Sequence, residues 1–411
     1  MRKILNWTVF VAALGYFVDM FDLTIFGVVR VASLKGIGIT DPARITSSGI
    51  LLVNVGAAGM LLGGLLWGVI GDKRGRLSVL FGSILLYSTA NVLNAFVGSL
   101  EAYAILRFIA GVGLAGELGA AVTLISEILS KEDRGYGTTL IATLGLMGAV
   151  AASLVGQVLT WQTAYLVGGG MGFLLLLARF RMADSKLFAR REGAAPRGSL
   201  RVLLSGARLP RYLQCVLIGV PIYYTTGVLF TFAPELTKDL GIGGVTAGNA
   251  LLFGSLGLTL GDLASGLLSQ RLRSRRGAIG IFMGAGALGA CAYFLFREAS
   301  AALFYAICFA LGTAAGFWAV LVTMTAEQFG TNVRATAATS VPNFVRSAVI
   351  PLTLSFTALR PLGSAHAAML LGVLVFTLAG FSLWLVPESF GRDLDFVEQG
   401  ELVLEKLEAT Y

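Results

Sequence analysis

The feature that most constrains this chain is a series of long apolar segments that recurs from one end to the other. We count twelve, each close to or above the roughly 20 residues that a helix needs to cross the hydrocarbon core of a bilayer. They lie near 7–29, 45–71, 77–99, 101–129, 135–159, 163–182, 211–234, 245–269, 278–297, 300–327, 335–359 and 364–386. Because a backbone inside lipid must satisfy its own hydrogen bonds, the pattern predicts an all-α membrane protein with twelve transmembrane helices.

The charge of the chain follows its expected topology. Charged residues make up 13% of the sequence, against about 25% in soluble proteins. Most of the 31 Lys and Arg fall at one side of the predicted spans, above all in 73–76, 179–211 and 271–276. The positive-inside rule places that side and both termini in the cytoplasm. The net charge of +8 therefore indicates orientation in a lipid bilayer, as expected in a bacterial inner membrane, and not a nucleic-acid partner.

A basic, loop-like stretch divides the chain into two halves. The expected parts are a six-helix bundle at 1–183, a cytoplasmic loop at 184–210, a second six-helix bundle at 211–386 and a cytoplasmic tail at 387–411. Glu127 and Arg134 recur about 200 residues later as Glu327 and Arg334. Internal repeats are typical of transporter folds, so we predict two pseudo-symmetric bundles.

Three motifs carry a resemblance to a known family. GVIGDKRGRL begins at Gly68, RFIAGVGLAGE begins at Arg107, and PESFGRDLDFVE begins at Pro387. In these motifs the chain resembles the major facilitator superfamily, and the last one resembles the sugar-porter-like members. The resemblance implies a monomeric carrier that works by alternating access, and not an enzyme. It also implies an inner gate, closed by the glycine contact and ion pairs of Gly68, Asp72, Arg76, Glu127, Arg134, Glu327 and Arg334.

The first apolar segment contains two carboxylates in GYFVDMFDLTIF, namely Asp19 and Asp22. An ionisable side chain inside the membrane is a functional hypothesis by default. At about 1.5 Å per residue, Asp22 and Arg107 come to similar depths, and Glu117 lies three turns further along the fourth segment. We predict that these four residues form a proton-coupling network, and a static ion pair between the first and fourth helices is the alternative. The resemblance supports coupling at Asp22, since proton-coupled sugar-porter-like members place an Asp opposite such an Arg.

Arg346 lies in the middle of the eleventh apolar segment, with Asn343 one turn before it. Arginine keeps its charge in proteins, so at this depth it needs a carboxylate, backbone carbonyls or an anionic ligand. We predict that Arg346 binds the carboxylate or phosphate of a substrate. The alternative is an ion pair with Asp262 of the eighth segment, which could also be a second proton site.

The remaining candidates are polar or aromatic residues that could line a central cavity. They are Tyr16, Asn54, Tyr223, Tyr224 and Trp318, each of which could equally be a packing residue. No phosphate-binding loop, metal-ligand spacing or nucleophile motif is present, so we expect no cofactor and no metal, with the proton as coupling ion.

Together these patterns favour proton-coupled symport of a small organic anion. A first alternative is proton-driven export of drugs or other amphiphiles, although GLMGAVAASLVG at Gly145 to Gly156 lacks the proline that such exporters have in helix five. A second is uncoupled carriage of a sugar or another neutral solute, although GVPIYYTTG lacks the paired glutamines of sugar porters.

Overall fold

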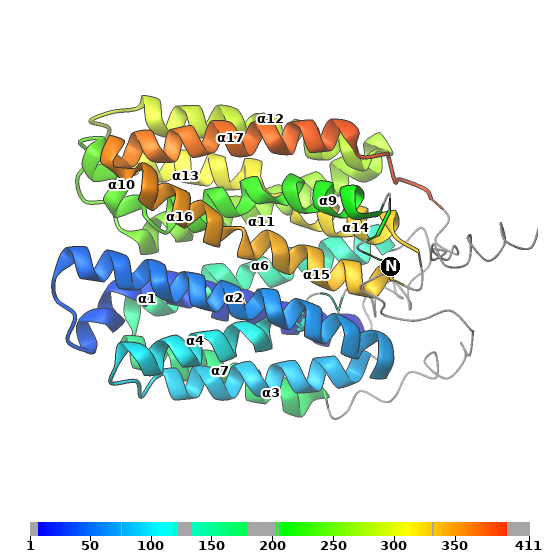
Figure 1. Cartoon of the computed structure of the whole chain (residues 1–411), viewed down its shortest axis with the longest axis horizontal. Helices are drawn as coiled ribbons and strands as arrows, with labels where there is room; N and C mark the ends of the chain where they lie inside the picture. The colour runs from blue at the N-terminus through cyan, green and yellow to red at the C-terminus, as the bar shows by residue number, and fades with distance from the viewer. Residues whose placement is uncertain are drawn as a thin grey trace, which may run out of the picture.

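The protein is a bundle of long helices. The computed structural model describes residues 7–74, 76–117, 119, 121, 134–179, 203, 205–206, 208–330 and 333–392, and contains no strand among them. The first half consists of α1 (Trp7–Gly36), α2 (Pro42–Arg74), α3 (Arg76–Asn94), α4 (Leu100–Leu114), α6 (Arg134–Val158) and α7 (Trp161–Arg179). These helices lie together on one side of the molecule (Figure 1).

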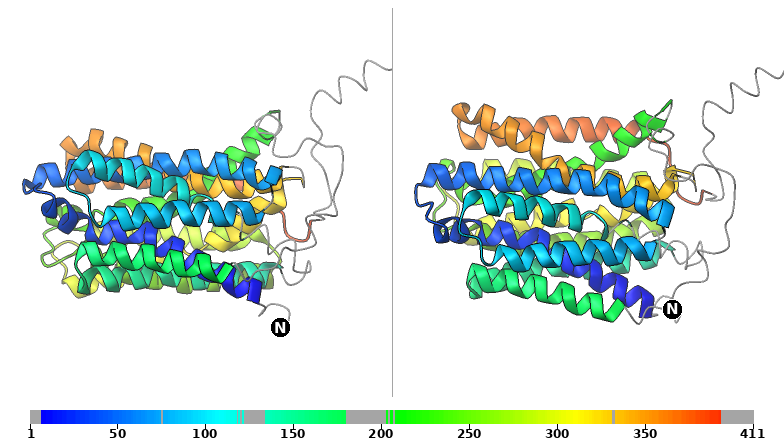
Figure 2. Two further views of the ribbon diagram at one scale, coloured as in Figure 1. Left: turned by 90° about the horizontal axis from the view of Figure 1, so that it is seen from below. Right: turned by 60° about the horizontal axis from the view of Figure 1, so that its bottom comes forward.

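The second half lies on the other side (Figure 1). It consists of α9 (Arg208–Tyr223), the π-helix η2 (Tyr224–Phe230), α10 (Ala233–Asp239), α11 (Ala247–Leu272), α12 (Arg275–Leu295), α13 (Ala301–Ala315), α14 (Trp318–Gln328), α15 (Arg334–Ser347), α16 (Val349–Leu359), the 3₁₀ turn η3 (Arg360–Leu362) and α17 (Ser364–Leu385). The helix axes of both halves run roughly parallel to one another (Figure 2). Most of the predicted central loop, 184–210, lies outside the described residues, so the domain boundaries stay a prediction.

The predicted spans correspond to these helices. Within the described ranges, nine segments are long and apolar enough to cross a membrane, and α3 holds a shorter apolar helix. α4 and the pair α15–α16 occupy the places of the fourth and eleventh predicted spans. The architecture is therefore the predicted one, twelve transmembrane helices in two six-helix bundles.

In the described part of the second half, three spans are not continuous α-helices. The seventh changes from α9 to the π-helix η2, the tenth is interrupted between α13 and α14 at Gly316 and Phe317, and the eleventh is interrupted at Ala348. Non-helical backbone at membrane depth is tolerated where it is buried in protein or lines a cavity. These interruptions therefore point to the centre of the molecule.

The two halves contact each other mainly along α2 and α6 of the first half. α2 packs against α15 and α16, and α6 packs against α11. Small residues allow this approach, because the side chain of Asn343 lies against Gly64 and Thr336 lies against Gly68. We call the end at which α1 begins and α17 ends the proximal end, and the opposite end the distal end.

Candidate functional site

A cavity of about 140 Å³ lies between the two halves. α1, α2, α4 and α6 of the first half and α9, η2, α11, α14, α15 and α16 of the second contribute to its wall. The lining residues are Tyr16, Met20, Leu23, Thr24, Phe26, Gly27, Val53, Ala57, Met60, Arg107, Leu146, Ala149, Ile222, Tyr223, Thr226, Gly227, Thr231, Leu251, Ser255, Leu258, Trp318, Arg346 and Val349. Among them, the only charged side chains are Arg107 and Arg346, so the wall is apolar and its charge is positive.

Arg346 reaches the cavity from α15 and connects the two halves. Its Nη2 lies 2.8 Å from Oδ2 of Asp19 on α1, and both side chains are fully buried. Oδ1 of Asp19 and Nε of Arg346 have no hydrogen-bond partner among the described residues. The expected alternative, an ion pair between Arg346 and Asp262, is not formed; Asp19 takes that place. The guanidinium thus has donor capacity left for a ligand.

Aromatic side chains surround Arg346. Its guanidinium carbon lies 5.9 Å from the centre of the Trp318 ring, and Trp318 meets Tyr223 edge to face at 5.9 Å between centroids. Tyr16 contributes a third ring to the wall. These three predicted cavity residues are brought together, whereas Tyr224 turns away from the cavity and donates a hydrogen bond to the carbonyl of Ala368, at 2.6 Å.

Asp22 and Arg107 do not form the expected pair. Arg107 lies on the cavity wall with its guanidinium 4.6 Å from the ring centre of Phe26. Asp22 is fully buried inside the first bundle, where its carboxylate lies next to Gly168 of α7 and has no hydrogen-bond partner within 3.5 Å among the described residues. The charges of Asp19 and Arg107 act on it electrostatically. Asp22 therefore lies behind the cavity wall.

Glu117 has a partner that the sequence did not indicate. Its carboxylate forms a buried ion pair with Arg179, whose Nη1 also donates to the carbonyl of Leu80 at 2.7 Å. Arg179 was counted among the loop cations, but it is the last residue of α7 and is 1% exposed. The ion pair thus joins the end of α7 to the chain just after α4. Neither Glu117 nor Arg179 lines the cavity.

Asp262 caps a helix. Its Oδ1 accepts a hydrogen bond from the backbone N–H of Ala319 at 2.7 Å, in the first turn of α14. The carboxylate is fully buried, and Oδ2 has no partner among the described residues.

Asn54 and Asn343 are contacts between the halves and not cavity residues. Asn54 accepts a hydrogen bond from Thr353 at 2.8 Å, and Asn343 donates to the carbonyl of Ala115 at 2.8 Å. Ser347 donates to the carbonyl of Ala57 at 2.8 Å between these two points. A row of polar contacts therefore joins α2 and α4 to α15 and α16.

The expected inner gate is described only in part. Glu127 lies outside the described residues, as do the side chains of Asp72, Arg76 and Arg134. Glu327 forms its ion pair with Arg275, at 3.0 Å, and accepts a hydrogen bond from Ser389. Arg334 donates from Nε to the carbonyls of Ala326 and Phe329. At the proximal end, Glu327 therefore joins α14 to α12 and to the segment after α17.

Sequence reasoning missed one further pair. Arg30 near the distal end of α1 is 1% exposed, and its Nη2 lies 3.0 Å from Oε1 of Glu235 on α10. The guanidinium also lies 4.8 Å from the ring centre of Phe232. The signal in the sequence for this buried pair was an arginine in the same helix as Asp19 and Asp22.

The fold and the sequence give the same assignment. The family model described as Major Facilitator Superfamily matches residues 12–353. The chain belongs to the major facilitator superfamily. It is therefore a secondary transporter with a small-molecule substrate, embedded in a membrane, and not an enzyme.

Curated relatives and solved structures agree with this assignment. The niacin transporter NiaP of Acinetobacter baylyi (strain ATCC 33305 / BD413 / ADP1) is 26% identical over 94% of this transporter and 95% of its own length. The putative niacin/nicotinamide transporter NiaP of Bacillus subtilis (strain 168) is 27% identical over 84% and 85%. The solved structure of the proton:xylose symporter XylE, bound to 6-bromo-6-deoxy-D-glucose, matches with a TM-score of 0.71 at 16% identity and covers 99% of both chains. That last likeness concerns the fold alone.

Proposed function

We propose that this transporter couples the inward movement of protons to the uptake of a small organic anion, in particular a monocyclic aromatic carboxylate. The observation that carries the proposal is the charge of the cavity wall, whose only charged side chains among the described lining residues are Arg107 and Arg346. A carboxylate gains charge-assisted hydrogen bonds from a guanidinium, whereas a cation would be repelled. Export of cationic drugs is therefore disfavoured.

The size and chemistry of the cavity support an aromatic ring. Its volume of about 140 Å³ is close to the about 150 Å³ of an engineered apolar cavity that binds benzene. The tyrosine and tryptophan side chains at Tyr16, Tyr223 and Trp318 offer ring faces and edges, which favour offset or edge-to-face contacts with another ring. Niacin is a pyridine carboxylate, so it has one aromatic ring of about this size and the negative charge that a guanidinium binds. Two relatives carry niacin in their names.

The ion pair between Asp19 and Arg346 supplies a coupling mechanism. A substrate carboxylate that binds Arg346 competes with Asp19, since both are anions that need the same guanidinium. Once displaced, the buried Asp19 carboxylate would be an uncompensated charge, which is costly, so it takes up a proton. Substrate and proton are then bound together. Asp22, one turn further along α1 and behind the wall, is the second proton site that we propose.

Topology completes the proposal. With Lys and Arg concentrated at the proximal ends of the helices, both termini face the cytoplasm of a bacterial cell and the distal end faces outward. The protein acts as a monomer, uses the proton as its coupling ion and needs no other cofactor.

The test is uptake of radiolabelled nicotinate by purified protein in liposomes. An imposed inward proton gradient is expected to drive accumulation above the external concentration, and an uncoupler is expected to abolish the accumulation. Uptake that does not change with the imposed proton gradient contradicts the proposed coupling. A lack of any transport of nicotinate, benzoate or short aliphatic acids contradicts the proposed substrate class.

A further inference from the structure

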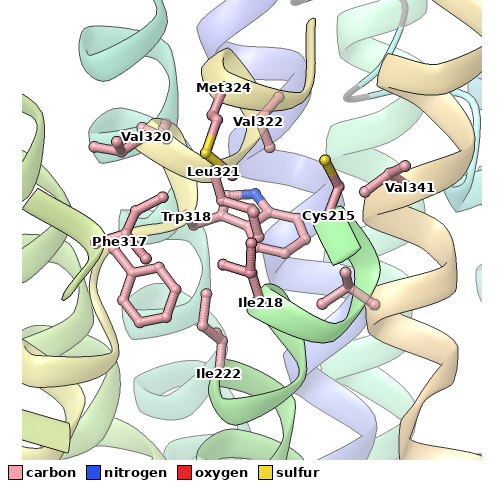
Figure 3. Packing of buried hydrophobic residues seen from close by; sticks show 14 of the residues in the cluster. Cys215, Ile218, Ile222, Phe317, Trp318, Val320, Leu321, Val322, Met324 and Val341 are labelled. Carbon is pink, nitrogen blue, oxygen red and sulfur yellow. The ribbon is translucent and has the colours of Figure 1, made fainter. Parts of the chain in front are cut away.

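Trp318 is the first residue of α14 and forms part of the cavity wall. Figure 3 shows its indole ring packed among Cys215, Ile218 and Leu321. The indole Nε1–H is buried and has no hydrogen-bond partner among the described residues. On the cavity wall, the ring of Trp318 lies beside the guanidinium of Arg346, whose central carbon is 5.9 Å from the ring centre.

The position of Trp318 depends on an interrupted helix. α13 ends at Ala315 and α14 begins at Trp318, so the first backbone N–H groups of α14 lack partners inside their own helix. The residue that would normally cap them, Phe317, has no side-chain acceptor. Inside a membrane, an unsatisfied N–H group costs several kcal/mol. An acceptor from another helix is therefore required.

Asp262 of α11 is this acceptor. Its Oδ1 lies 2.7 Å from the amide nitrogen of Ala319, next to Trp318. α11 approaches closely because residue 316 is a glycine, where a Cβ would clash with the backbone of Gly261 and Asp262. A carboxylate at a helix N-terminus also interacts favourably with the helix dipole. Asp262 thus does from α11 what an N-cap side chain does within its own helix.

We propose that Asp262 is a positioning residue that, by capping α14 from α11, fixes Trp318 on the cavity wall and so determines the preference of this transporter for an aromatic ring over an aliphatic chain. The substrate class rests on the proposed function, but the position of Trp318 does not. Asp262 contributes an acceptor here, and its role requires no proton transfer.

The experiment compares Asp262→Asn, which keeps an acceptor oxygen, with Asp262→Ala, which removes it. Ser265→Ala is the matched control, because Ser265 lies one turn further along α11 and donates to the backbone carbonyl of Asp262, with no hydrogen bond to α14 among the described residues. Uptake of labelled nicotinate and of labelled butyrate is measured in liposomes for each variant. Asp262→Ala is expected to raise the KM for nicotinate about tenfold, the equivalent of about one lost hydrogen bond, and to leave that for butyrate nearly unchanged. Asp262→Asn and Ser265→Ala are expected to stay within about twofold of the wild type in KM and to keep proton-driven accumulation.

A second measurement reads the position of Trp318 without any transport. In a background where Trp7, Trp67, Trp161 and Trp384 are Phe, Trp318 is the sole tryptophan, and its emission and its quenching by acrylamide report its environment. Asp262→Ala is expected to shift the emission to longer wavelength and to increase quenching, whereas Asp262→Asn is not. This result would support the positioning role even if nicotinate is not a substrate.

Two outcomes overturn the proposal. One is an Asp262→Ala variant with the emission and the nicotinate KM of the wild type. The other is loss of proton-driven accumulation in Asp262→Asn, which would make Asp262 a proton carrier. If Asp262→Ala does not fold, Asp262→Asn decides alone, since the proposal requires it to keep both accumulation and the wild-type emission.

Discussion

Arg346 and Asp19 form a buried ion pair across the two halves of the transporter, with 2.8 Å between Nη2 and Oδ2, although the two residues lie 327 positions apart in sequence. The pair joins α1 to α15 at the wall of the central cavity, so it connects the cavity to the contact between the halves. Neither partner is a surface charge, so each depends on the other or on a ligand.

Arg346→Ala is expected to abolish recognition of carboxylates. Truncating one partner of a buried charged contact typically costs about 2 kcal/mol or more, so the apparent affinity for nicotinate should fall at least about 30-fold. The measurement is the rise in melting temperature that nicotinate produces in purified protein, since a ligand of the folded state raises its stability. Arg346→Lys keeps the positive charge but not the planar guanidinium with its paired donors, and should recover part of the thermal shift. An unchanged thermal shift in Arg346→Ala would place the anion elsewhere.

Asp19→Asn is expected to uncouple transport from the proton gradient. Asparagine can still accept a hydrogen bond from Arg346, so the fold and the cavity should persist, but its side chain does not carry a proton. The variant should exchange labelled for unlabelled nicotinate across the membrane and fail to accumulate it under an inward proton gradient. Asp22→Asn provides the comparison: accumulation that survives Asp19→Asn but not Asp22→Asn would assign coupling to the carboxylate behind the wall.

The sequence indicated which charges matter but not how they pair. Three residues along a helix correspond to a rotation of about 300°, so Asp19 and Asp22 point about 60° apart. This difference turns Asp19 toward Arg346 and Asp22 toward Gly168 inside the first bundle. The rotation of a helix about its axis is decided by packing over the whole bundle. The depth of a residue along a single helix carries no information on that rotation. Depth alone therefore suggested Asp22 and Arg107, which are not paired in the structure.

The helix count and the two halves followed from hydropathy and the repeated motifs, since both depend on local sequence. The interruption at Gly316 and Phe317 did not, because no proline marks it and the segment is uniformly apolar. Without that interruption Asp262 has no helix to cap, so the sequence suggested only an ion pair with Arg346 or a second proton site. Arg30 was missed for a similar reason: α1 extends to Gly36, beyond the predicted end at 29, so Arg30 lies within the helix.

Gly111→Ala is expected to destabilise the first bundle. A Cβ at this position of α4 would clash with the backbone carbonyl of Gly56 on α2, which cannot move without separating the two helices. Overpacking of this kind costs about 1–3 kcal/mol, so the melting temperature in detergent should fall clearly below that of the wild type. Gly170→Ala on α7 is the matched control, because nothing lies within 4 Å of a Cβ there. Equal melting temperatures for the two variants would contradict the close contact of α2 and α4.

Glu388, after the end of α17, is expected to contribute pH-dependent stability. Burial opposes its ionisation, but hydrogen bonds from Ser274 and from the backbone N–H groups of Phe390, Arg275 and Ser389 outweigh burial and hold the pKa of Glu388 below its usual 4.5. A lowered pKa in the folded state means that its contribution is fully present above pH 4.5 and is lost as the pH falls through the lower folded-state value. Glu388→Gln should therefore lower the melting temperature at pH 7 and approach the wild type as the pH falls below 4.5.

The control for this prediction is Glu298→Gln, because Glu298 is an exposed carboxylate. The melting temperature of this variant should follow the wild type at each pH. A gap between Glu388→Gln and the wild type that stays constant from pH 7 to pH 3.5 would show that the ionisation of Glu388 is not involved.

Glu235→Gln is expected to favour opening at the distal end. The Arg30–Glu235 pair joins α1 to α10, and Arg30 also donates to the carbonyl of Thr231 at 3.4 Å, so it ties the first half to the end of η2. Removing the charge of Glu235 leaves the buried guanidinium without its carboxylate, and separation of the halves lets Arg30 reach water. In a background without Cys215, Cys291 and Cys308, a cysteine at the cavity position Thr226 should then react several-fold faster with a membrane-impermeant maleimide added from the distal side. The exchanged pair Arg30→Glu with Glu235→Arg should slow the reaction again, and a rate that does not respond to Glu235→Gln would mean that other contacts hold the distal end closed.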